Sequence, residues 1–330
     1  MTVLSGTEKV SKYPHTVKSD VLVSVCIQTY NHEKYLERCL DGILNQETNF
    51  NFEILLGEDN SKDRTRAICM EYADKYPDKI RLFLHSRDNV IYIGGNPTGR
   101  YNLLHNLLNA NGEFIAFCEG DDYWIDPKKL QKQVDFLQAN RDYSFTFHRI
   151  YSIKETTQKI TKSFRGETGG KTYYTKDFIV DFPASFLSLV FRNNLIEIPD
   201  WFKTVYGGDI FLMMLLSTKG NAYCHQEYMG VYNVHGGGLT GQWAKNNLFK
   251  ETKEVIAGLN FFNDHTAGRY EKAVIKRKKK LILKYQLLTT DKTLHRLKLD
   301  FIITFLYSQI TYLAVRTFVA RNIRYFFNLK

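Results

Sequence analysis

The stretch Phe-Cys-Glu-Gly-Asp-Asp-Tyr-Trp-Ile-Asp-Pro at residues 117–127 decides the fold. An apolar run, 114–117, ends abruptly in three acidic residues: Glu119, Asp121 and Asp122. Such runs are typical of buried parallel strands, and open α/β sheets bind ligands at the carboxyl ends of these strands. Clustered carboxylates near a core repel one another unless a cation or a donor offsets their charge. The pattern therefore favours a site for a divalent cation that carries substrate phosphates.

A purely structural interpretation is an acidic turn that caps the following helix. Asp126 before Pro127 is a good pair for the N-cap and the first helical position. This interpretation explains Asp126 but leaves Glu119, Asp121 and Asp122 unexplained, so the metal and phosphate interpretation is the stronger one.

Hydrophobic periodicity on both sides of this stretch alternates between strand and helix. The alternation predicts a parallel sheet covered by helices, preceded by a loose arm at residues 1–20. Later segments are less regular, with a glycine-rich loop expected at 162–171 and helices from 243 onward. We expect strands at 21–27, 52–56, 80–84, 114–117, 185–191 and 222–232, and helices at 35–44, 64–76, 101–108, 127–138 and 210–216.

The charge of the 330-residue chain is concentrated at its C-terminal end. Residues 242–330 carry 18 Lys and Arg against six Asp and Glu, a net of +12, so the other 241 residues carry −2 of the total of +10. Such a region could meet nucleic acid, acidic lipid headgroups or a protein partner. Its apolar run at 301–315 is shorter than the roughly 20 residues of a spanning helix. Two alternatives stay open for this run: a helix in the membrane interface, or a helix packed on the rest of the protein.

The five cysteines are scattered, odd in number and never in a CxxC pair, which argues against a disulfide framework and a cysteine zinc site. A reducing, cytoplasmic compartment fits this usage best. The polar first 20 residues contain no apolar segment of a signal peptide, so none is expected.

Four motifs in order give the chain a resemblance to the family 2 glycosyltransferases, the inverting enzymes with the GT-A fold. Val23–Asn31 resembles the family's opening strand and its Thr-Tyr-Asn turn, and Glu58–Thr65 resembles its Asp-Asp-Gly-Ser-x-Asp-x-Thr motif. Glu119–Asp122 resembles the Asp-x-Asp-Asp metal motif, and Gly207–Asp209 resembles the site of the catalytic acid residue. The resemblance covers residues 21–240. It departs from the family pattern at Glu58 and Glu119, where aspartate is usual.

The resemblance implies a mostly parallel, Rossmann-like sheet covered by helices, with a helical C-terminal extension. It divides the chain into an arm at 1–20, a catalytic domain at 21–241 and a basic, helical, possibly membrane-associating region at 242–330. Within the catalytic domain we expect a nucleotide-binding half at about 21–126 and an acceptor half at about 127–241.

For the nucleotide, the resemblance implies that Asp59 accepts a hydrogen bond from the imide N–H of uracil or thymine. Thr29, Tyr30 and Asn31 would contact base and ribose, and Arg100 would contact phosphate. Asp59 could instead serve only as a turn and capping residue, and Arg100 could be one of many arginines that serve solubility.

For the metal, the resemblance implies that Asp121 and Asp122 hold Mg²⁺ or Mn²⁺, with one of them also on the ribose and Glu119 as a supporting partner. His235, which precedes three glycines, could complete the metal site or close over the diphosphate. A solvent-facing loop histidine is the alternative. Trp124 could stack on a sugar, although core packing fits an indole better here.

Asp209 is the expected general base, because inversion requires a carboxylate that takes the proton of the attacking acceptor hydroxyl. The alternative is an N-cap of the helix from Ile210, and the two roles are compatible.

The predicted function is inverting, metal-dependent sugar transfer from a nucleotide-diphosphate donor, with UDP-sugar favoured, to a saccharide hydroxyl. In the family, enzymes of this length often extend lipid-linked oligosaccharides, which favours a peripheral place at the cytoplasmic face of a membrane and a lipid-linked acceptor. No nucleic-acid partner is expected, because the tail lacks a recognised motif. A nucleotidylyltransferase is disfavoured, because Thr-Tyr-Asn-His-Glu replaces the glycine-rich loop that such an enzyme needs after the first strand. The remaining alternative is a membrane- or nucleic-acid-associated binding or scaffold protein with a non-catalytic GT-A domain.

Overall fold

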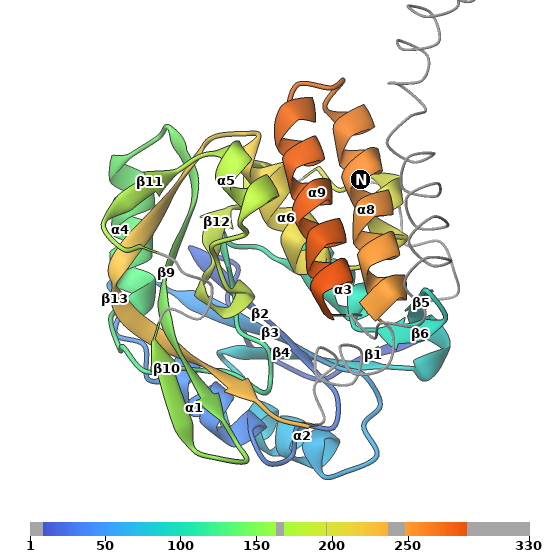
Figure 1. The fold of residues 1–330 in the computed structure, drawn as a ribbon. Helices are drawn as coiled ribbons and strands as arrows, with labels where there is room; N and C mark the ends of the chain where they lie inside the picture. The colour runs from blue at the N-terminus through green and yellow to red at the C-terminus, as the bar shows by residue number, and fades with distance from the viewer. Residues whose placement is uncertain (1–8, 163–167, 196, 237–247, 289–330) are drawn as a thin grey trace, which may run out of the picture. The chain divides into compact units, whose positions relative to one another are not determined.

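The computed structural model describes residues 9–162, 168–195, 197–236 and 248–288 (Figure 1). The chain divides into two compact units, Met1–Tyr270 and Glu271–Lys330. The described part of the second unit is the helix α9 (Glu271–Leu288). The domain boundary that the sequence places at 241 lies outside the described residues and stays a prediction.

The first unit is built on a large, mainly parallel sheet, as the sequence predicts. Four neighbouring strands run parallel in the order β4-β3-β2-β7. Each is mostly apolar and mostly buried, which matches strands covered on both faces. Their bounds are β2 (Val23–Thr29), β3 (Phe52–Glu58), β4 (Ile80–His85) and β7 (Phe114–Phe117), and the helices that follow are α1 (Leu36–Leu44), α2 (Thr65–Lys75) and α3 (Arg100–Asn109).

Beyond β7 the sheet becomes mixed. The short strand β12 (Val190–Arg192) runs antiparallel to both β7 and β9 (Tyr143–Lys154), and β13 (Asn221–Val234) runs parallel to β9. The carboxyl ends of β9 and β13 therefore point the same way. The remaining elements are β1 (Val10–Lys12), β5 (Ile91–Ile93), β6 (Asn96–Thr98), β8 (Tyr123–Trp124), α4 (Lys129–Ala139), β10 (Lys159–Lys162), β11 (Lys171–Tyr173), α5 (Thr175–Val180), α6 (Gly208–Ser217) and α8 (Leu248–His265).

Three expectations differ from the structure. Residues 185–191 were expected as one strand, but they form a 3₁₀ turn, Phe186–Ser188, followed by β12. The arm at 1–20 contributes β1, which pairs antiparallel with β4 at the sheet edge. The long strand β9 has no counterpart among the expected elements, although Ser144–His148 alternates polar and apolar residues as a strand does.

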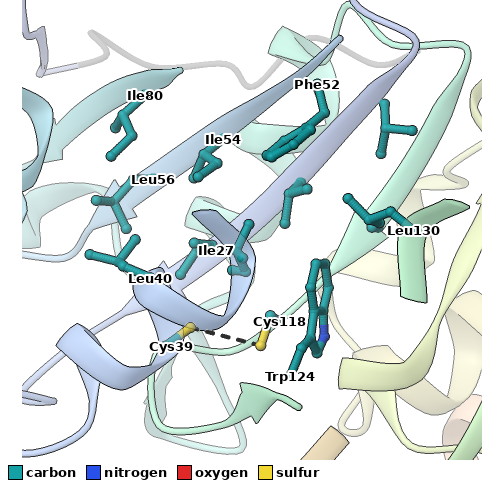
Figure 2. Close-up of a cluster of buried hydrophobic side chains, with 14 of the residues drawn as sticks. Ile27, Cys39, Leu40, Phe52, Ile54, Leu56, Ile80, Cys118, Trp124 and Leu130 are labelled. Atoms are coloured by element: carbon teal, nitrogen blue, oxygen red, sulfur yellow. Dashed lines mark hydrogen bonds between the residues drawn. The ribbon is translucent and has the colours of Figure 1, made fainter. Parts of the chain in front are cut away.

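One hydrophobic cluster joins the parallel strands to α1 and to the segment after β7 (Figure 2). Ile27, Ile54 and Leu40 are fully buried in it, each burial contributing about 1.5–3 kcal/mol. Cys39 of α1 and Cys118, just after β7, lie with their sulfur atoms 3.7 Å apart in the same cluster. All five cysteines are free and buried, so they act as small hydrophobic residues. The cluster fixes the end of β7, where the acidic turn begins.

The described helices include none long and apolar enough to cross a membrane. The apolar run at 301–315 lies outside the described residues, so both of its alternatives stay open. In α9, Lys272, Lys276, Lys279 and Lys280 are exposed, at spacings that place them along one side of a helix.

Candidate active site

The loops that follow β2 and β3 are joined by several hydrogen bonds. The backbone N–H of Asn31 donates to Oγ of Ser61 at 2.9 Å, and the N–H of Lys62 donates to Oδ1 of Asn31 at 2.9 Å. Asn31 has a φ of 56°, in the left-handed region that asparagine tolerates best after glycine. The N–H of His32 donates to Oγ1 of Thr65 at 2.7 Å. These bonds hold the ends of two parallel strands as one rigid edge.

Asp59 lies at this edge, beside the turn that contains Tyr30. Its N–H donates to the carbonyl oxygen of Thr29 at 3.1 Å, and its side chain is nearly buried. Burial raises the pKa of Asp59 to about 7, with a further rise from Glu58, while Arg87 lowers it. The guanidinium of Arg87 also lies 4.4 Å from the centroid of the Tyr30 ring. A carboxylate, an aromatic face and a cation are thus gathered in one place, which suits a planar base with a polar edge.

Glu58 has a structural role, unlike the neighbouring Asp59. Its fully buried carboxylate accepts hydrogen bonds from Nε of Arg66 and, at 2.6 Å, from the N–H of Ser61. Both oxygens are thereby used to hold the turn after β3. The substitution of glutamate for the family's aspartate therefore falls on a structural carboxylate.

Asp121 is flanked by two histidines that come from distant parts of the chain. Nε2 of His235 lies 3.0 Å from Oδ2 of Asp121, and Nε2 of His32 lies 3.7 Å from the same oxygen. Burial alone would raise the pKa of Asp121, but the hydrogen bond with His235 and the nearness of His32 leave it lowered. The same hydrogen bond raises the pKa of His235. The structure thus brings together the residues expected at 121 and 235.

Asp122 is more deeply buried than Asp121. Its Oδ1 accepts a hydrogen bond from the N–H of Asn233 at 2.9 Å, while Oδ2 has no hydrogen-bond partner among the described residues. Burial, followed by the charges of Asp121 and Glu119, raises the pKa of Asp122 well above its usual value. A buried carboxylate with an unpaired oxygen is costly unless a cation approaches it.

The donor set at this turn fits a hard divalent cation. Carboxylate oxygens from Asp121 and Asp122 suit Mg²⁺ or Mn²⁺, and an imidazole such as His235 is acceptable to Mn²⁺. Among the described residues, no three His, Cys, Asp or Glu side chains gather closely enough to form a complete set of ligands. Mg²⁺ is commonly held by one or two carboxylates together with substrate phosphates, so an incomplete protein set agrees with its chemistry.

The first turn of α3 connects the two halves of the site. Nδ2 of Asn102 donates to the carbonyl oxygen of Gly57 at 2.8 Å, at the end of β3. The buried guanidinium of Arg100 donates to the carbonyl oxygens of Phe202 and, at 3.1 Å, of Val205. Arg100 therefore holds the segment that leads to Gly207. Its expected contact with phosphate stays a prediction, and here its donors face carbonyl groups.

Asp209 is the second residue of α6, which begins at Gly208. Gly207 precedes it with a φ of 79°, a conformation that favours glycine. The alternative N-cap role of Asp209 is therefore wrong, because the helix begins two residues earlier than Ile210. Burial lowers the pKa of Arg100 to about 10, and the negative charge of Asp209 raises it. The guanidinium and the carboxylate therefore attract each other. The carboxylate is left in the first turn of the helix, at the end of the segment that Arg100 holds.

Glu119 and Trp124 frame the acidic turn. The carbonyl oxygen of Glu119 accepts from the N–H of Asp122 at 2.9 Å, which closes the turn. Nε1 of Trp124 donates to the carbonyl oxygen of Leu187 at 2.9 Å, and Nζ of Lys129 lies 3.7 Å from its ring centroid. Trp124 is buried, so it packs in the core beside the turn, and the structure offers no open indole face for a sugar.

Four residues of the site escaped the sequence analysis: His32, Tyr35, Arg87 and Asn233. The ring of Tyr35 lies 4.6 Å from that of His235, and its hydroxyl donates to Oε1 of Glu155 at 3.0 Å. His32 directly follows the Thr-Tyr-Asn turn, so its position next to a motif was an available signal. Asn233 lies two residues before His235, which was a weaker signal of the same kind. Arg87 had no such signal, because only the fold brings it near Asp59.

Comparisons with known proteins show the family to which the chain belongs. The family model described as Glycosyl transferase family 2 matches residues 24–197, more than half of the chain. An uncharacterised protein of Mycobacterium bovis is 31% identical over 262 residues, covering 77% of this chain and 71% of its own. The GalNAc(5)-diNAcBac-PP-undecaprenol beta-1,3-glucosyltransferase of Campylobacter jejuni is 29% identical over 216 residues, covering 64% of each chain.

Solved structures share the fold at low sequence identity. TarS of S. aureus in complex with UDP-GlcNAc has a TM-score of 0.54 at 19% identity, over 72% of this chain and 65% of that chain. The mannosyltransferase PcManGT of Pyrobaculum calidifontis, with GDP-Man and Mn²⁺, has a TM-score of 0.50 at 14% identity, over 96% of this chain and 87% of that chain. The chain belongs to glycosyl transferase family 2, and it is a glycosyltransferase with the GT-A fold.

Proposed function

We propose that this protein transfers a sugar, with inversion and with the aid of a divalent cation, from a UDP-sugar to a hydroxyl group of a lipid-linked saccharide. The observation that carries the proposal is the convergence at one edge of the sheet. Tyr30 and Asp59 directly follow β2 and β3, and the turn with Asp121 and Asp122 follows the neighbouring strand β7. A base and a diphosphate have this order along a nucleotide sugar.

In the proposed nucleotide site, Asp59 accepts a hydrogen bond from the imide N–H of uracil, and the base lies against Tyr30. Arg87 donates to the polar edge of the base. A planar base with an imide suits these groups because it presents a donor to a carboxylate and acceptors to a guanidinium.

In the proposed transfer site, Asp121, Asp122 and His235 would hold the cation. When bound, Mg²⁺ or Mn²⁺ neutralises the charge that develops on the departing diphosphate. Asp209 takes the proton from the acceptor hydroxyl as the hydroxyl oxygen forms its bond to the anomeric carbon and the bond to the diphosphate breaks. Asp122 keeps the acidic turn in register with β13 through the N–H of Asn233.

The lipid-linked acceptor is supported by relatives whose names state such substrates. Besides the Campylobacter enzyme, a UDP-Glc:alpha-D-GlcNAc-diphosphoundecaprenol beta-1,3-glucosyltransferase of Escherichia coli is 33% identical over 121 residues, or 37% of this chain. The exposed lysines of α9 add a surface that suits anionic headgroups. We propose contact with the inner face of the cell membrane through the region 242–330.

Product analysis tests the transfer itself. UDP-glucose and UDP-GlcNAc, each an α-linked donor, are incubated with Mn²⁺ and a GlcNAc-diphosphate carrying a short alkyl chain, and the product is examined by NMR. A β linkage supports inversion, whereas an α linkage contradicts it. UDP release that requires the protein but not the cation would contradict the proposed metal dependence.

Vesicle sedimentation tests the membrane contact. The full-length protein should bind vesicles that contain phosphatidylglycerol at low salt and should release them as salt rises, because the attraction is electrostatic. A variant with Lys272, Lys276, Lys279 and Lys280 changed to Gln should bind less. Equal binding to pure phosphatidylcholine vesicles, or tighter binding to DNA than to phosphatidylglycerol, would contradict the proposal.

A further inference from the structure

One face of the sheet becomes accessible to solvent next to the candidate active site. In β9 the residues up to His148 are buried on both faces, and from Arg149 onward buried and partly exposed residues alternate. Ile150 and Ser152 are buried, whereas Arg149 and Tyr151 are partly exposed. The change of pattern means that, in the described part of the chain, this face of the strand is partly exposed from Arg149 onward.

The covered part of that face belongs to α5. Phe145 and Phe147 point to the same side as Arg149, because side chains alternate along a strand. The rings of both pack against Phe178 of α5, with centroids 5.0 and 5.9 Å away. In Figure 1 the hairpin of β9 and β10 continues away from α5, toward α1. The partly exposed face of β9 from Arg149 onward therefore lies on the side of the sheet that carries α5.

Two tyrosines and two cationic side chains lie on this partly exposed face of β9 and its neighbouring strands. The rings of Tyr151 and Tyr228 stack with centroids 4.6 Å apart and planes at 23°. The guanidinium of Arg149 lies 4.2 Å from the Tyr228 centroid, and Nζ of Lys162 lies 5.9 Å from it. Lys162 belongs to this face because it is the register partner of Tyr151 in the antiparallel pair of β9 and β10. We call Arg149, Tyr151, Lys162 and Tyr228 the tyrosine platform.

The register of β13 places the tyrosine platform in line with the candidate active site. Tyr151 is the partner of Val231, and Ile153 is the partner of Asn233, two residues before His235. Since His235 is four positions after Val231, the tyrosines lie about 13 Å along the strands from the histidine, at about 3.3 Å per residue. The distance is that of a short oligosaccharide and not of a single sugar in the transfer site.

The charges of the platform suit an anion. Arginine and lysine bind phosphate oxygens by charge-assisted hydrogen bonds, and tyrosine faces bind the apolar faces of sugar rings. A saccharide with a diphosphate at its reducing end presents both features in one molecule.

We propose that the tyrosine platform binds the diphosphate end of a saccharide-diphosphate acceptor whose other end reaches Asp209 and His235. Arg149 and Lys162 donate to the diphosphate, and Tyr151 and Tyr228 contact the sugar nearest to it. The inference rests on the proposed function, because it names the site for the acceptor of that reaction. It also gives the acceptor a direction, with its hydroxyl at the carboxyl ends of β9 and β13.

The test measures binding by isothermal titration calorimetry to the full-length protein with UDP and Mn²⁺ present. The probes are α-GlcNAc-diphosphate with a short alkyl chain, the uncharged alkyl GlcNAc glycoside and inorganic pyrophosphate. We expect the alkyl diphosphate to bind more tightly than the glycoside. In the double variant Arg149→Gln/Lys162→Gln its affinity should fall roughly tenfold or more, as expected for lost hydrogen bonds to a charged group.

Lys159→Gln is the matched control, because Lys159 is exposed on the same strand but points to the opposite face. This control should bind the alkyl diphosphate as the unchanged protein does. Tyr228→Leu should weaken the glycoside and the alkyl diphosphate by a similar factor, because it removes the stacking face and not the charge. The melting temperature of each variant with UDP and Mn²⁺ shows whether the donor site is intact.

Three results would overturn the proposal. They are no binding of the alkyl diphosphate to the unchanged protein, binding that occurs only when UDP and Mn²⁺ are left out, and equal losses in the double variant and in Lys159→Gln. The last would mean unspecific attraction. Failure of UDP to bind with any cation is a separate result. It would contradict the proposed function, whereas the binding of the alkyl diphosphate can still be measured and judged by itself.

Discussion

Nε2 of His235 lies 3.0 Å from Oδ2 of Asp121, although 114 residues separate them in the chain. The first residue follows β13 and the second follows β7, and these strands are three apart in the sheet. The relationship depends on β9 and β12, which fill the space between. The candidate metal site is therefore a product of the sheet order and not of either motif alone.

Nucleotide binding should strengthen as the pH rises from about 6 to about 8, because only the ionised Asp59 accepts from an imide and its pKa is about 7. The stability contribution of this group runs the other way. Folding raises the pKa of Asp59 from 3.8 to about 7, so the native state binds the proton more tightly than the unfolded state does. The contribution of Asp59 to the free energy of unfolding therefore falls as the pH rises from the first of these values to the second. Titration of UDP by calorimetry at several pH values checks the first effect.

Asp59→Asn is the matched variant, because it keeps the size of the side chain and removes the titration. It should bind UDP more weakly above pH 7 and show little dependence on pH. A pH dependence equal to that of the unchanged protein would assign the effect to another group.

Asp209→Asn should lower kcat by about 10²–10⁴-fold while the affinity for UDP stays the same, because general base catalysis contributes on that scale. The exposed Asp200 gives a control, Asp200→Asn, which should leave kcat unchanged. Turnover with saturating donor and acceptor measures kcat. A variant at Asp209 with normal turnover would exclude this residue as the base.

Arg100→Met should lower the free energy of unfolding by roughly 2–4 kcal/mol, because it leaves buried carbonyl groups of Phe202 and Val205 without their charged donor. It should also lower kcat, since these carbonyls lie in the segment that leads to Gly207 and Asp209. Chemical denaturation gives the stability, and Arg64→Gln, at a mostly exposed arginine, is the control. An unchanged unfolding midpoint would contradict the structural role of Arg100.

The parallel half of the fold was predictable because each strand is a short apolar run followed by a periodic helix. Asp121, Asp122 and Asp59 were predictable for the same reason, since each follows such a strand. The long strand β9 was missed although Ser144–His148 alternates polar and apolar residues, because the alternation stops at Arg149 and does not span the strand. Arg87 was missed because nothing local distinguishes it, whereas Asn233 lies two residues before His235 and its contact with Asp122 depends on strand order.

The capping role considered as the alternative for Asp209 shows a different limit. The sequence placed the start of the helix at Ile210, but Gly208 is already helical and Gly207 takes the left-handed conformation. The surroundings of Asp209 also depend on Arg100, more than a hundred residues earlier in the chain. A Cβ on the neighbouring Gly208 would lie 2.4 Å from the guanidinium of Arg100. Such a contact between distant segments cannot be inferred from either segment by itself.

The most direct test of the central claim is thermal unfolding with UDP, dTDP, GDP and CDP, each with and without Mn²⁺. A ligand that binds only the native state raises its apparent stability by about 2.7 kcal/mol at a concentration of 100 times its Kd. We predict that UDP with Mn²⁺ raises the melting temperature, and that the shift is lost in Asp121→Asn/Asp122→Asn and kept in Asp126→Asn. Absence of a shift with all four nucleotides, or an equal shift in the double variant, would contradict a cation-dependent nucleotide-sugar site at this turn.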